Sequence, residues 1–256
     1  MPARDHEQPS DSAGTPWAGR HFDESPASDD DGSAPPALIR AIEEFHAGAV
    51  GESAVVDVFR ESRLLVPIVA ELGESGLSAS GLLVDKSAEL SIVTVEGPDG
   101  RPVLPVFSSV EAMARWNPKA RPVPADAVRV ALAAASESTE LVVLDPVSAT
   151  EFVLRRPAVW AVAQGLPWQP SHTDPAVLAE FRRTTVDARV LAVAIEAGDP
   201  GARLAGPALI VAITIEAGLS AADLTAMLAI LSTQWGSSEL IAERVDSLTV
   251  RFLPET

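Results

Sequence analysis

The sequence predicts an α+β protein: an N-terminal domain with a mixed or antiparallel sheet and flanking helices, then a smaller αββαβ module. Three observations carry this prediction. Short alternating apolar segments indicate strands, apolar residues three and four apart indicate helices, and a proline-rich stretch separates two such sets. Hydrophobic residues make up 47% of the chain but aromatic residues only 5%, so Val, Leu, Ile and Ala must build most of the core.

Composition divides the chain into four segments. We predict a disordered acidic tail over 1–34, a sheet domain over 35–166, a proline-rich linker over 167–175 and a C-terminal module over 176–256. The tail holds eight acidic and two basic residues and too little apolar surface to offset the entropy of ordering it. The alternative is that the tail is an interaction arm that carries Trp17 and Phe22.

Two helices and a strand are expected at the start of the sheet domain. Pro36 suits a helix start, and apolar residues follow it at helical spacing up to Phe45. A second short helix is expected over 53–60, and the apolar run 63–70 reads as a strand. Because proline cannot donate to a ladder, Pro67 places this strand at a sheet edge or a bulge.

A hairpin is the next expectation, with strands over 90–96 and 101–107 joined by the turn Gly97-Pro-Asp-Gly100. Ser108 to Glu111 has the pattern of a capping box, which starts a helix that runs to Trp116. The remaining elements expected in this domain are a helix over 125–135, a strand over 141–144, its hairpin partner over 152–154 and a closing helix over 157–164.

The C-terminal module begins with a short helix over 175–183. Residues 190–197 and 209–216 alternate as strands, Ser220 opens a helix with an apolar stripe, and 248–252 alternates again. This order leaves one sheet face uncovered. That face carries Ala192, Ala194, Ile210 and Ala212, and we expect either the first domain or a second copy to cover it, with Trp168 at the contact.

Charge and composition exclude several classes of function. The chain has 19 Lys and Arg against 36 Asp and Glu, a net charge of −17, which opposes binding to nucleic acid or to an anionic membrane. With no cysteine, the chain has no disulfides and no thiolate sites. The N-terminus does not resemble a secretory signal and no apolar run is long enough to span a bilayer, so we expect a cytoplasmic protein.

No catalytic, cofactor or metal site is predicted. The chain has four histidines, and His46, three residues after Glu43, shares a helix face with it that we interpret as solvated. No Gly-x-Ser-x-Gly elbow, dinucleotide fingerprint or phosphate-binding loop occurs. The acidic residues at turns, Asp246 among them, are expected to act as caps and turn formers.

Five residues are candidates for an interaction surface. Arg155 with Arg156, and Arg182 with Arg183, are paired cations that would bind carboxylates of a partner, or else complement acidic residues of this chain. Trp168 lies between two prolines and is the best candidate for an anchor or an inter-module contact. Trp116 and Trp160 are expected to lie in the core.

Several of these segments together resemble a known family. They are Arg63-Leu-Leu-Val-Pro-Ile-Val69, Asp85-Lys-Ser-Ala-Glu-Leu90, Gly100-Arg-Pro-Val-Leu-Pro-Val-Phe-Ser-Ser109, the Glu111 to Trp116 helix, Arg121-Pro-Val-Pro124 and Leu144-Asp-Pro146. Residues 35–166 resemble the SseB N-terminal domain in its actinobacterial form, and the second module is similar to the C-terminal domain of longer members. The resemblance implies an α+β fold. The family name is linked to serine sensitivity and to a secretion translocon component, and it carries over no catalytic residue.

Two functions remain open at this stage. The first is a non-enzymatic interaction or regulatory protein, whose partner is an unidentified protein or a second copy of the chain. The second is a small-ligand-binding protein or an enzyme that uses carboxylates and arginines in a cleft between the modules. The missing motifs favour the first, because most reaction classes need at least one of them.

Overall fold

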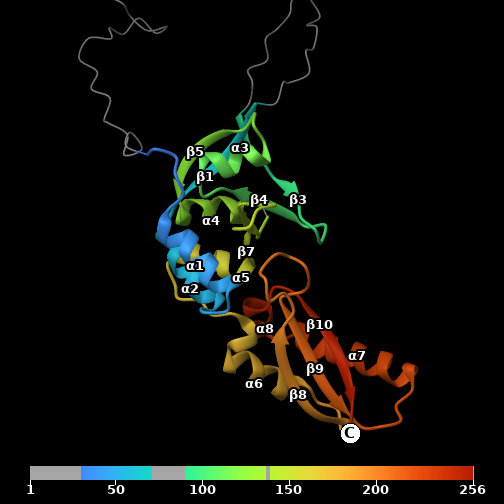
Figure 1. Cartoon of the computed structure of the whole chain (residues 1–256). Helices are drawn as coiled ribbons and strands as arrows, with labels where there is room; N and C mark the ends of the chain where they lie inside the picture. The colour runs from blue at the N-terminus through green and yellow to red at the C-terminus, as the bar shows by residue number, and fades with distance from the viewer. Residues whose placement is uncertain (1–29, 71–89, 137–138, 256) are drawn as a thin grey trace, which may run out of the picture. The chain divides into compact units, whose positions relative to one another are not determined.

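The structure, a computed structural model, describes residues 30–70, 90–136 and 139–255 (Figure 1). From Gly32 onward the chain forms one compact unit. Helices and three sheets confirm the predicted α+β class. The expectations for Trp17, Phe22 and the segment 85–89 lie outside the described residues.

The first two helices form where the sequence predicts them. Helix α1 (Pro36–His46) has proline in its first turn, and α2 (Glu52–Arg60) follows after a short turn. Leu38 and Ile42 of α1 and Phe59 of α2 are buried, because the apolar residues recur at helical spacing on one face.

The first sheet has the order β2-β1-β5, with β1 (Arg63–Ala70) antiparallel to both β2 (Leu90–Ile92) and β5 (Arg121–Asp126). Strand β1 is therefore central, and the prediction that Pro67 marks an edge or a bulge is wrong. Pro67 lies opposite Pro122, and on the β2 side pairing begins only at Ile68. Neither proline has an N–H to donate, and the two lie opposite each other at a position where the hydrogen-bond ladder between β1 and β5 requires no N–H donor.

The second sheet has the order β3-β4-β6-β7, made of β3 (Val95–Glu96), β4 (Pro102–Val106), β6 (Val142–Leu144) and β7 (Phe152–Leu154). The predicted hairpin is confirmed for β3 and β4, with Gly100 of its turn at φ +80°. Its first strand is shorter than predicted, because residues 90–92 pair with β1 in the other sheet. Strands β6 and β7 form the predicted antiparallel pair, and β4 runs parallel to β6.

Three more helices, α3 (Val110–Trp116), α4 (Ala127–Ser136) and α5 (Arg156–Gln164), complete this part. The capping box predicted at Ser108 is wrong by one residue. Ser109 caps α3 by accepting a hydrogen bond from the Ala112 N–H (3.1 Å), while the buried Ser108 hydroxyl donates to Asp145 (2.6 Å). Ser108 is thus part of the core and not of the cap.

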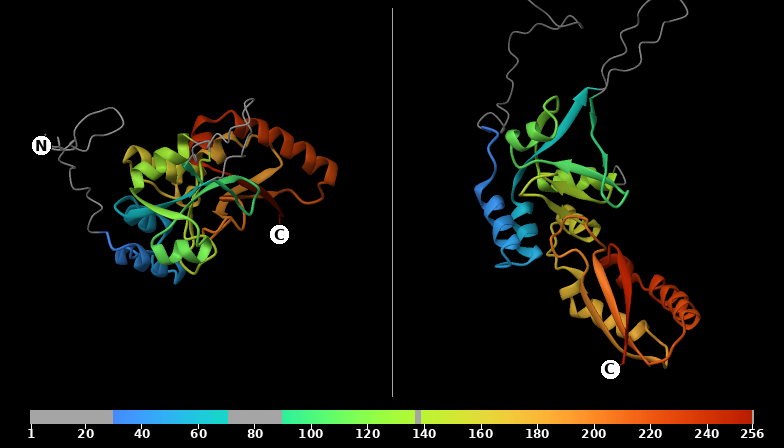
Figure 2. Two further views of the ribbon diagram at one scale, coloured as in Figure 1. Left: turned by 90° about the horizontal axis from the view of Figure 1, so that it is seen from above. Right: turned by 45° about the vertical axis from the view of Figure 1, so that its right-hand side comes forward.

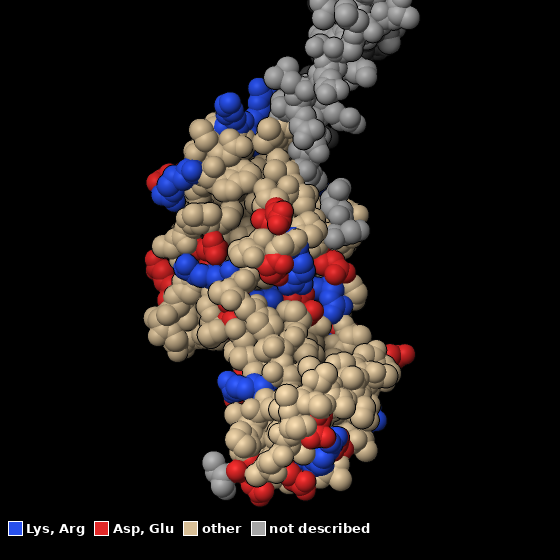
Figure 3. All heavy atoms as spheres, turned by 90° about the vertical axis from the view of Figure 1, so that its right-hand side faces the viewer, with Lys and Arg blue, Asp and Glu red and all other residues tan. Residues whose placement is uncertain are grey.

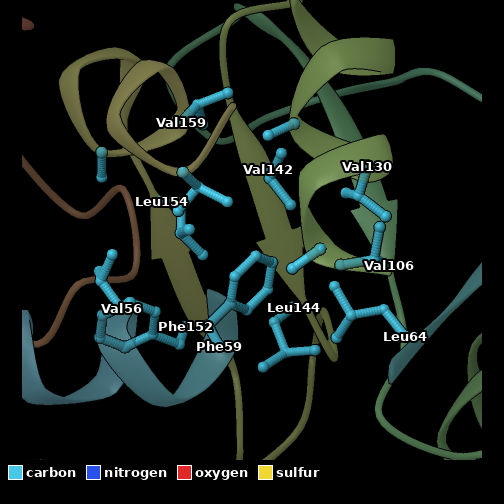
Figure 4. Close-up of a cluster of buried hydrophobic side chains, with 14 of the residues drawn as sticks. Val56, Phe59, Leu64, Val106, Val130, Val142, Leu144, Phe152, Leu154 and Val159 are labelled. Carbon is cyan, nitrogen blue, oxygen red and sulfur yellow. The ribbon is translucent and has the colours of Figure 1, made fainter. Parts of the chain in front are cut away.

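The main core lies between the second sheet and helices α1, α2, α4 and α5. Figure 4 shows side chains from α2, α4 and α5, from β4, β6 and β7 and from β1 pointing toward one another around Phe59 and Phe152. Apart from the phenylalanines, the labelled side chains are Val and Leu, as the composition predicted.

The C-terminal part holds α6 (Pro175–Thr184), β8 (Val190–Ala197), β9 (Leu209–Ile215), α7 (Ala221–Gly236), α8 (Glu239–Arg244) and β10 (Leu248–Pro254). Figure 2 shows its sheet from two further sides; the strand order is β10-β9-β8, with β10 parallel and β8 antiparallel to β9. The predicted order is confirmed, with α8 as an additional helix. Ser220 and Asp223 form a reciprocal capping box at the start of α7.

One face of this sheet is covered by α6 and α7, whose Phe181 and Trp235 rings meet edge to face with centroids 5.2 Å apart. On the opposite face Ala212 of the central strand is buried and Ile210 is half-buried, whereas Ala192 and Ala194 are exposed. The first domain therefore does not cover Ala192 and Ala194, which corrects that expectation. A second copy on this face stays a prediction.

We expect Phe152→Ala to lower the free energy of unfolding by about 3–5 kcal/mol, because it leaves a cavity in the main core. The measurement is chemical denaturation followed by tryptophan fluorescence. Leu132→Ala, at a side chain that is 54% exposed on α4, is the control and should change little. Equal losses for the two variants would contradict the position of Phe152 at the centre of the core.

Candidate functional site

The loop between β8 and β9, residues 198–208, reaches back to the first domain. The Val153 N–H donates to the Ala202 carbonyl (2.8 Å), which extends the ladder beyond β7. Ala202 and Leu204 are each 3% exposed and pack into two core clusters of the first domain. Both residues have positive φ, 50° and 55°, a backbone conformation that costs energy outside glycine. The buried contacts of the loop hold it in this conformation.

Tight packing closes the base of this loop. A Cβ atom added to Gly198 would lie 2.2 Å from the Pro207 carbonyl oxygen, so only glycine fits there. Inside the loop, the Asp199 carboxylate accepts hydrogen bonds from the N–H groups of Arg203 (3.0 Å) and Leu204 (2.8 Å). These bonds fix the Asp199 carboxylate within the loop.

Arg155 binds this part of the chain through four hydrogen bonds. One terminal nitrogen donates to Asp199 (2.7 Å) and to the Gly206 carbonyl (2.7 Å), and the other donates to Asp246 (3.2 Å) and Ser247 (3.3 Å). The side chains of Arg155, Asp199 and Asp246 are 10%, 3% and 2% exposed. Every acceptor lies beyond residue 198, so one guanidinium joins the two parts of the chain.

Arg101, in the β3–β4 turn, completes what we call the junction network: Arg101, Arg155, Asp199 and Asp246. It donates to both oxygens of Asp246 (3.1 and 3.0 Å), a bidentate geometry, and to Asp99 (2.7 Å). Burial opposes ionisation of Asp246, but the hydrogen bonds and charges of Arg101 and Arg155 outweigh it and keep its pKa below the usual value. Figure 3 shows charged side chains of both signs gathered in a band across the face that it displays.

Glu52, at the start of α2, lies near this network. Burial is the main cause that raises its pKa to about 7; the Arg155 charge acts against this rise and the Asp199 charge adds to it. Glu52 therefore ionises with difficulty although a guanidinium lies near it.

A groove of about 470 Å³ lies along α5. We call it the tryptophan groove. It is lined by α5, the segment after α5, the start of α6 and the end of α8, with Pro157, Trp160, Leu166, Trp168, Glu243 and Arg244 among its residues. Trp160 is 37% exposed and Leu166 is 51% exposed.

Hydrogen bonds from two arginines hold the walls of the groove. Arg156 donates to the carbonyls of Ala242 (2.7 Å) and Val245 (2.8 Å) at the end of α8, and its guanidinium lies over the Trp160 ring, 5.3 Å from the centroid. Arg60 donates to the Leu166 carbonyl (2.6 Å). Trp168 is partly buried and packs against the main core.

Some polar groups at the edge of the groove have a hydrogen-bond or ion-pair partner within the protein, and others do not. Arg244 pairs with Asp174 (2.7 Å), which also caps α6 by accepting from the Ala176 N–H. Among the residues that the structure describes, Glu243 has no cationic partner and the indole N–H groups of Trp160 and Trp168 have no acceptor, whereas the Trp235 N–H donates to Thr185 (3.2 Å). The groove thus offers donors and one carboxylate to an incoming group.

The five residues that the sequence singles out fall in different places. Trp168 lines the groove, Arg156 supports it and Arg155 forms the centre of the junction network. Arg182 donates to the Val193 carbonyl (3.3 Å) and Arg183 pairs with Glu180 (2.6 Å), so both serve the C-terminal part alone.

Sequence reasoning missed Trp160, which it assigned to the core, and the pairing partners Asp199 and Asp246. The signal for Trp160 is that it follows Arg156 by four residues on one helix face. Asp199 and Asp246 lie 44 and 91 residues from Arg155, and no local pattern marks them.

The described ranges contain neither a cluster of metal ligands nor a membrane-spanning helix. No group of three or more His, Asp or Glu side chains there is placed to hold a metal ion, and His46 with Glu43 forms none. None of the helices described is both long enough and apolar enough to cross a membrane.

Comparison with known proteins identifies a family match. The family described as SseB protein N-terminal domain matches residues 38–161, which span α1 to the middle of α5. None of the curated proteins and none of the solved structures matches the chain.

We expect Arg155→Met to lower the free energy of unfolding by about 3–5 kcal/mol, because it leaves buried carboxylates without their cation. In native-state hydrogen exchange, the amides of Arg203 and Leu204 should lose protection first. The control is Arg129→Met, whose side chain is 81% exposed and should have little effect. Wild-type protection of the loop in Arg155→Met would show that the loop docks without this arginine.

Glu52→Gln should stabilise the protein, and more so at high pH. The folded-state pKa of about 7 lies above the ordinary 4.5, so the penalty is absent below about pH 4.5, grows as pH rises, and is complete above pH 7. The gain over wild type should be larger at pH 8 than at pH 5.5 by roughly 1–2 kcal/mol. Denaturation at both pH values measures it, with the exposed Glu44→Gln as control. A gain that does not change with pH would contradict the raised pKa.

Proposed function

The chain belongs to the SseB family through the domain that spans residues 38–161, and from this premise we propose that it is a non-enzymatic interaction or regulatory protein. The tryptophan groove is the surface at which it binds a protein partner. We place this activity in the cytoplasm, and the net charge of −17 disfavours nucleic acid and anionic membranes as partners.

One observation carries the proposal: two tryptophans with unused indole N–H groups line the same groove. Tryptophan is enriched among residues that dominate binding energy, because it combines a large apolar surface with a polar tip. A partly exposed Trp160 that an arginine holds in place supports binding, since little freedom remains to be lost when a partner arrives.

The alternative, a small-ligand site or an enzyme with a carboxylate and arginine cleft, has less support. Its groups would be Arg101 and Arg155, and both guanidiniums already bind Asp246. An anionic ligand would have to displace this carboxylate, which is 2% exposed. The raised pKa of Glu52 arises first from burial, a cause that packing alone supplies.

The test compares wild type with Trp160→Ser in binding a partner that is identified by affinity purification from the native cell and then purified itself. We expect the dissociation constant, measured by calorimetry, to rise about ten-fold or more. Leu132→Ser, an exposed apolar residue on α4, is the matched control and should bind as wild type does.

Two outcomes would overturn the proposal. One is a purified partner that binds Trp160→Ser as tightly as wild type. The other is a metabolite that stabilises the wild-type chain in a thermal-shift screen while no protein binds. If sedimentation shows that the partner is a second copy, the groove is a homo-oligomer surface and the proposal holds.

A further inference from the structure

We infer that the segment that fills the tryptophan groove is a proline-rich stretch in the extended polyproline II conformation, with a Lys or Arg beside it that pairs with Glu243. This inference rests on the proposed function, because it names the kind of partner that the groove takes.

The lining of the groove selects the class of ligand. Trp160 and Trp168 face the groove together with Pro157 and Leu166. Proline-rich segments dock in grooves lined by aromatic residues, because their rings stack on aromatic faces and their backbone is already ordered. The cost of ordering such a ligand is therefore small.

The unused indole donors distinguish an extended ligand from a helix. A polyproline II segment has no internal hydrogen bonds, so its carbonyls can accept from the two indole N–H groups. In an α-helix the backbone carbonyls already accept hydrogen bonds from the helix's own N–H groups, so the side of the helix presents no free carbonyl to an indole N–H. Two indole donors in one groove thus favour an extended chain.

The walls are held in place before any ligand arrives. Arg156 joins Trp160 to the carbonyls of Ala242 and Val245, and its guanidinium covers one face of the indole. Trp168 packs on the main core. Arg156 thus connects α5 and α8, the two helices that line the groove, in the absence of a ligand.

The charges around the groove select the flanking residue. Arg244 is neutralised by Asp174 at 2.7 Å, and Arg156 lies 4.0 Å from Glu140. Of the two carboxylates that line the groove, Asp174 and Glu243, only Glu243 has no cationic partner among the described residues. A basic residue next to the proline stretch would pair with the Glu243 carboxylate. The net charge of −17 would favour the approach of such a residue.

Titration of the full chain with synthetic peptides tests the inference, with tryptophan fluorescence and calorimetry as readouts. The probes are an oligoproline that ends in Arg, the same oligoproline ending in Glu, and a Gly-Ser peptide ending in Arg. We expect the first to bind, the second to bind about three-fold more weakly, and the third not to bind.

Three variants sharpen the result. Trp160→Ser should weaken binding of the Arg-terminated oligoproline about ten-fold or more. Glu243→Lys should reverse the preference between the Arg and Glu peptides, whereas Glu239→Lys, exposed on the same helix, should leave that preference unchanged. Circular dichroism shows whether each variant is folded.

Equal binding of the Gly-Ser peptide would overturn the inference, because the contact would then be electrostatic alone. So would the failure of both oligoprolines to bind. Neither result bears on the proposed function, which depends on whether Trp160→Ser loses a purified protein partner. Loss of that partner without oligoproline binding would show that the groove recognises another kind of segment.

Discussion

A buried guanidinium must be matched by acceptors on all sides, and Arg155 obtains its acceptors from the far part of the chain. Asp199, Gly206, Asp246 and Ser247 surround it, although the nearest of them is 44 residues away in sequence. Removing one member of such a network leaves buried charges unpaired, so the network favours the arrangement of the parts in which all its members meet. The loop after β8 and the start of β10 are held where this one side chain can reach both.

The tryptophan groove follows from the same arrangement. Arg155 immediately precedes α5, and the next residue, Arg156, extends from that helix to the end of α8. Trp160 lies one turn further along α5, beside the Arg156 guanidinium. Two adjacent arginines therefore do different work: one is buried among carboxylates, and the other connects two helices and orients an aromatic ring. A shift of α8 would open the groove and also disturb Asp246, only two residues after that helix.

Local patterns predicted most of the secondary structure, and the errors have physical causes. Strand β5, Arg-Pro-Val-Pro-Ala-Asp, was missed because two prolines hide a strand that pairs through its other residues. Residues 90–96 look like one strand because alternation does not show that the chain leaves one sheet for another at residue 93. Helix α8 has six residues, too few for a periodic pattern to be visible. Ser108 is distinguished from Ser109 by its hydrogen bond to Asp145. Asp145 belongs to a distant turn, so the local sequence does not show which of the two serines caps the helix.

The candidate site likewise has one part that the local sequence predicts and one part that depends on contacts between distant segments. Trp160 and Trp168 are eight residues apart, with Gly165 between them. This glycine ends α5 at φ +66°, and the segment beyond it brings Trp168 to the groove that Trp160 already lines. A tryptophan, a glycine helix stop and a second tryptophan between prolines are all readable in the sequence, so this half of the groove was predictable. Its other half, Glu243 and Arg244, comes from a helix about 80 residues later, and the bonds of Arg156 to that helix, together with the Arg244–Asp174 pair, bring it there. The aromatic wall is therefore a property of one short segment, whereas the charge that would select a ligand exists only in the folded chain.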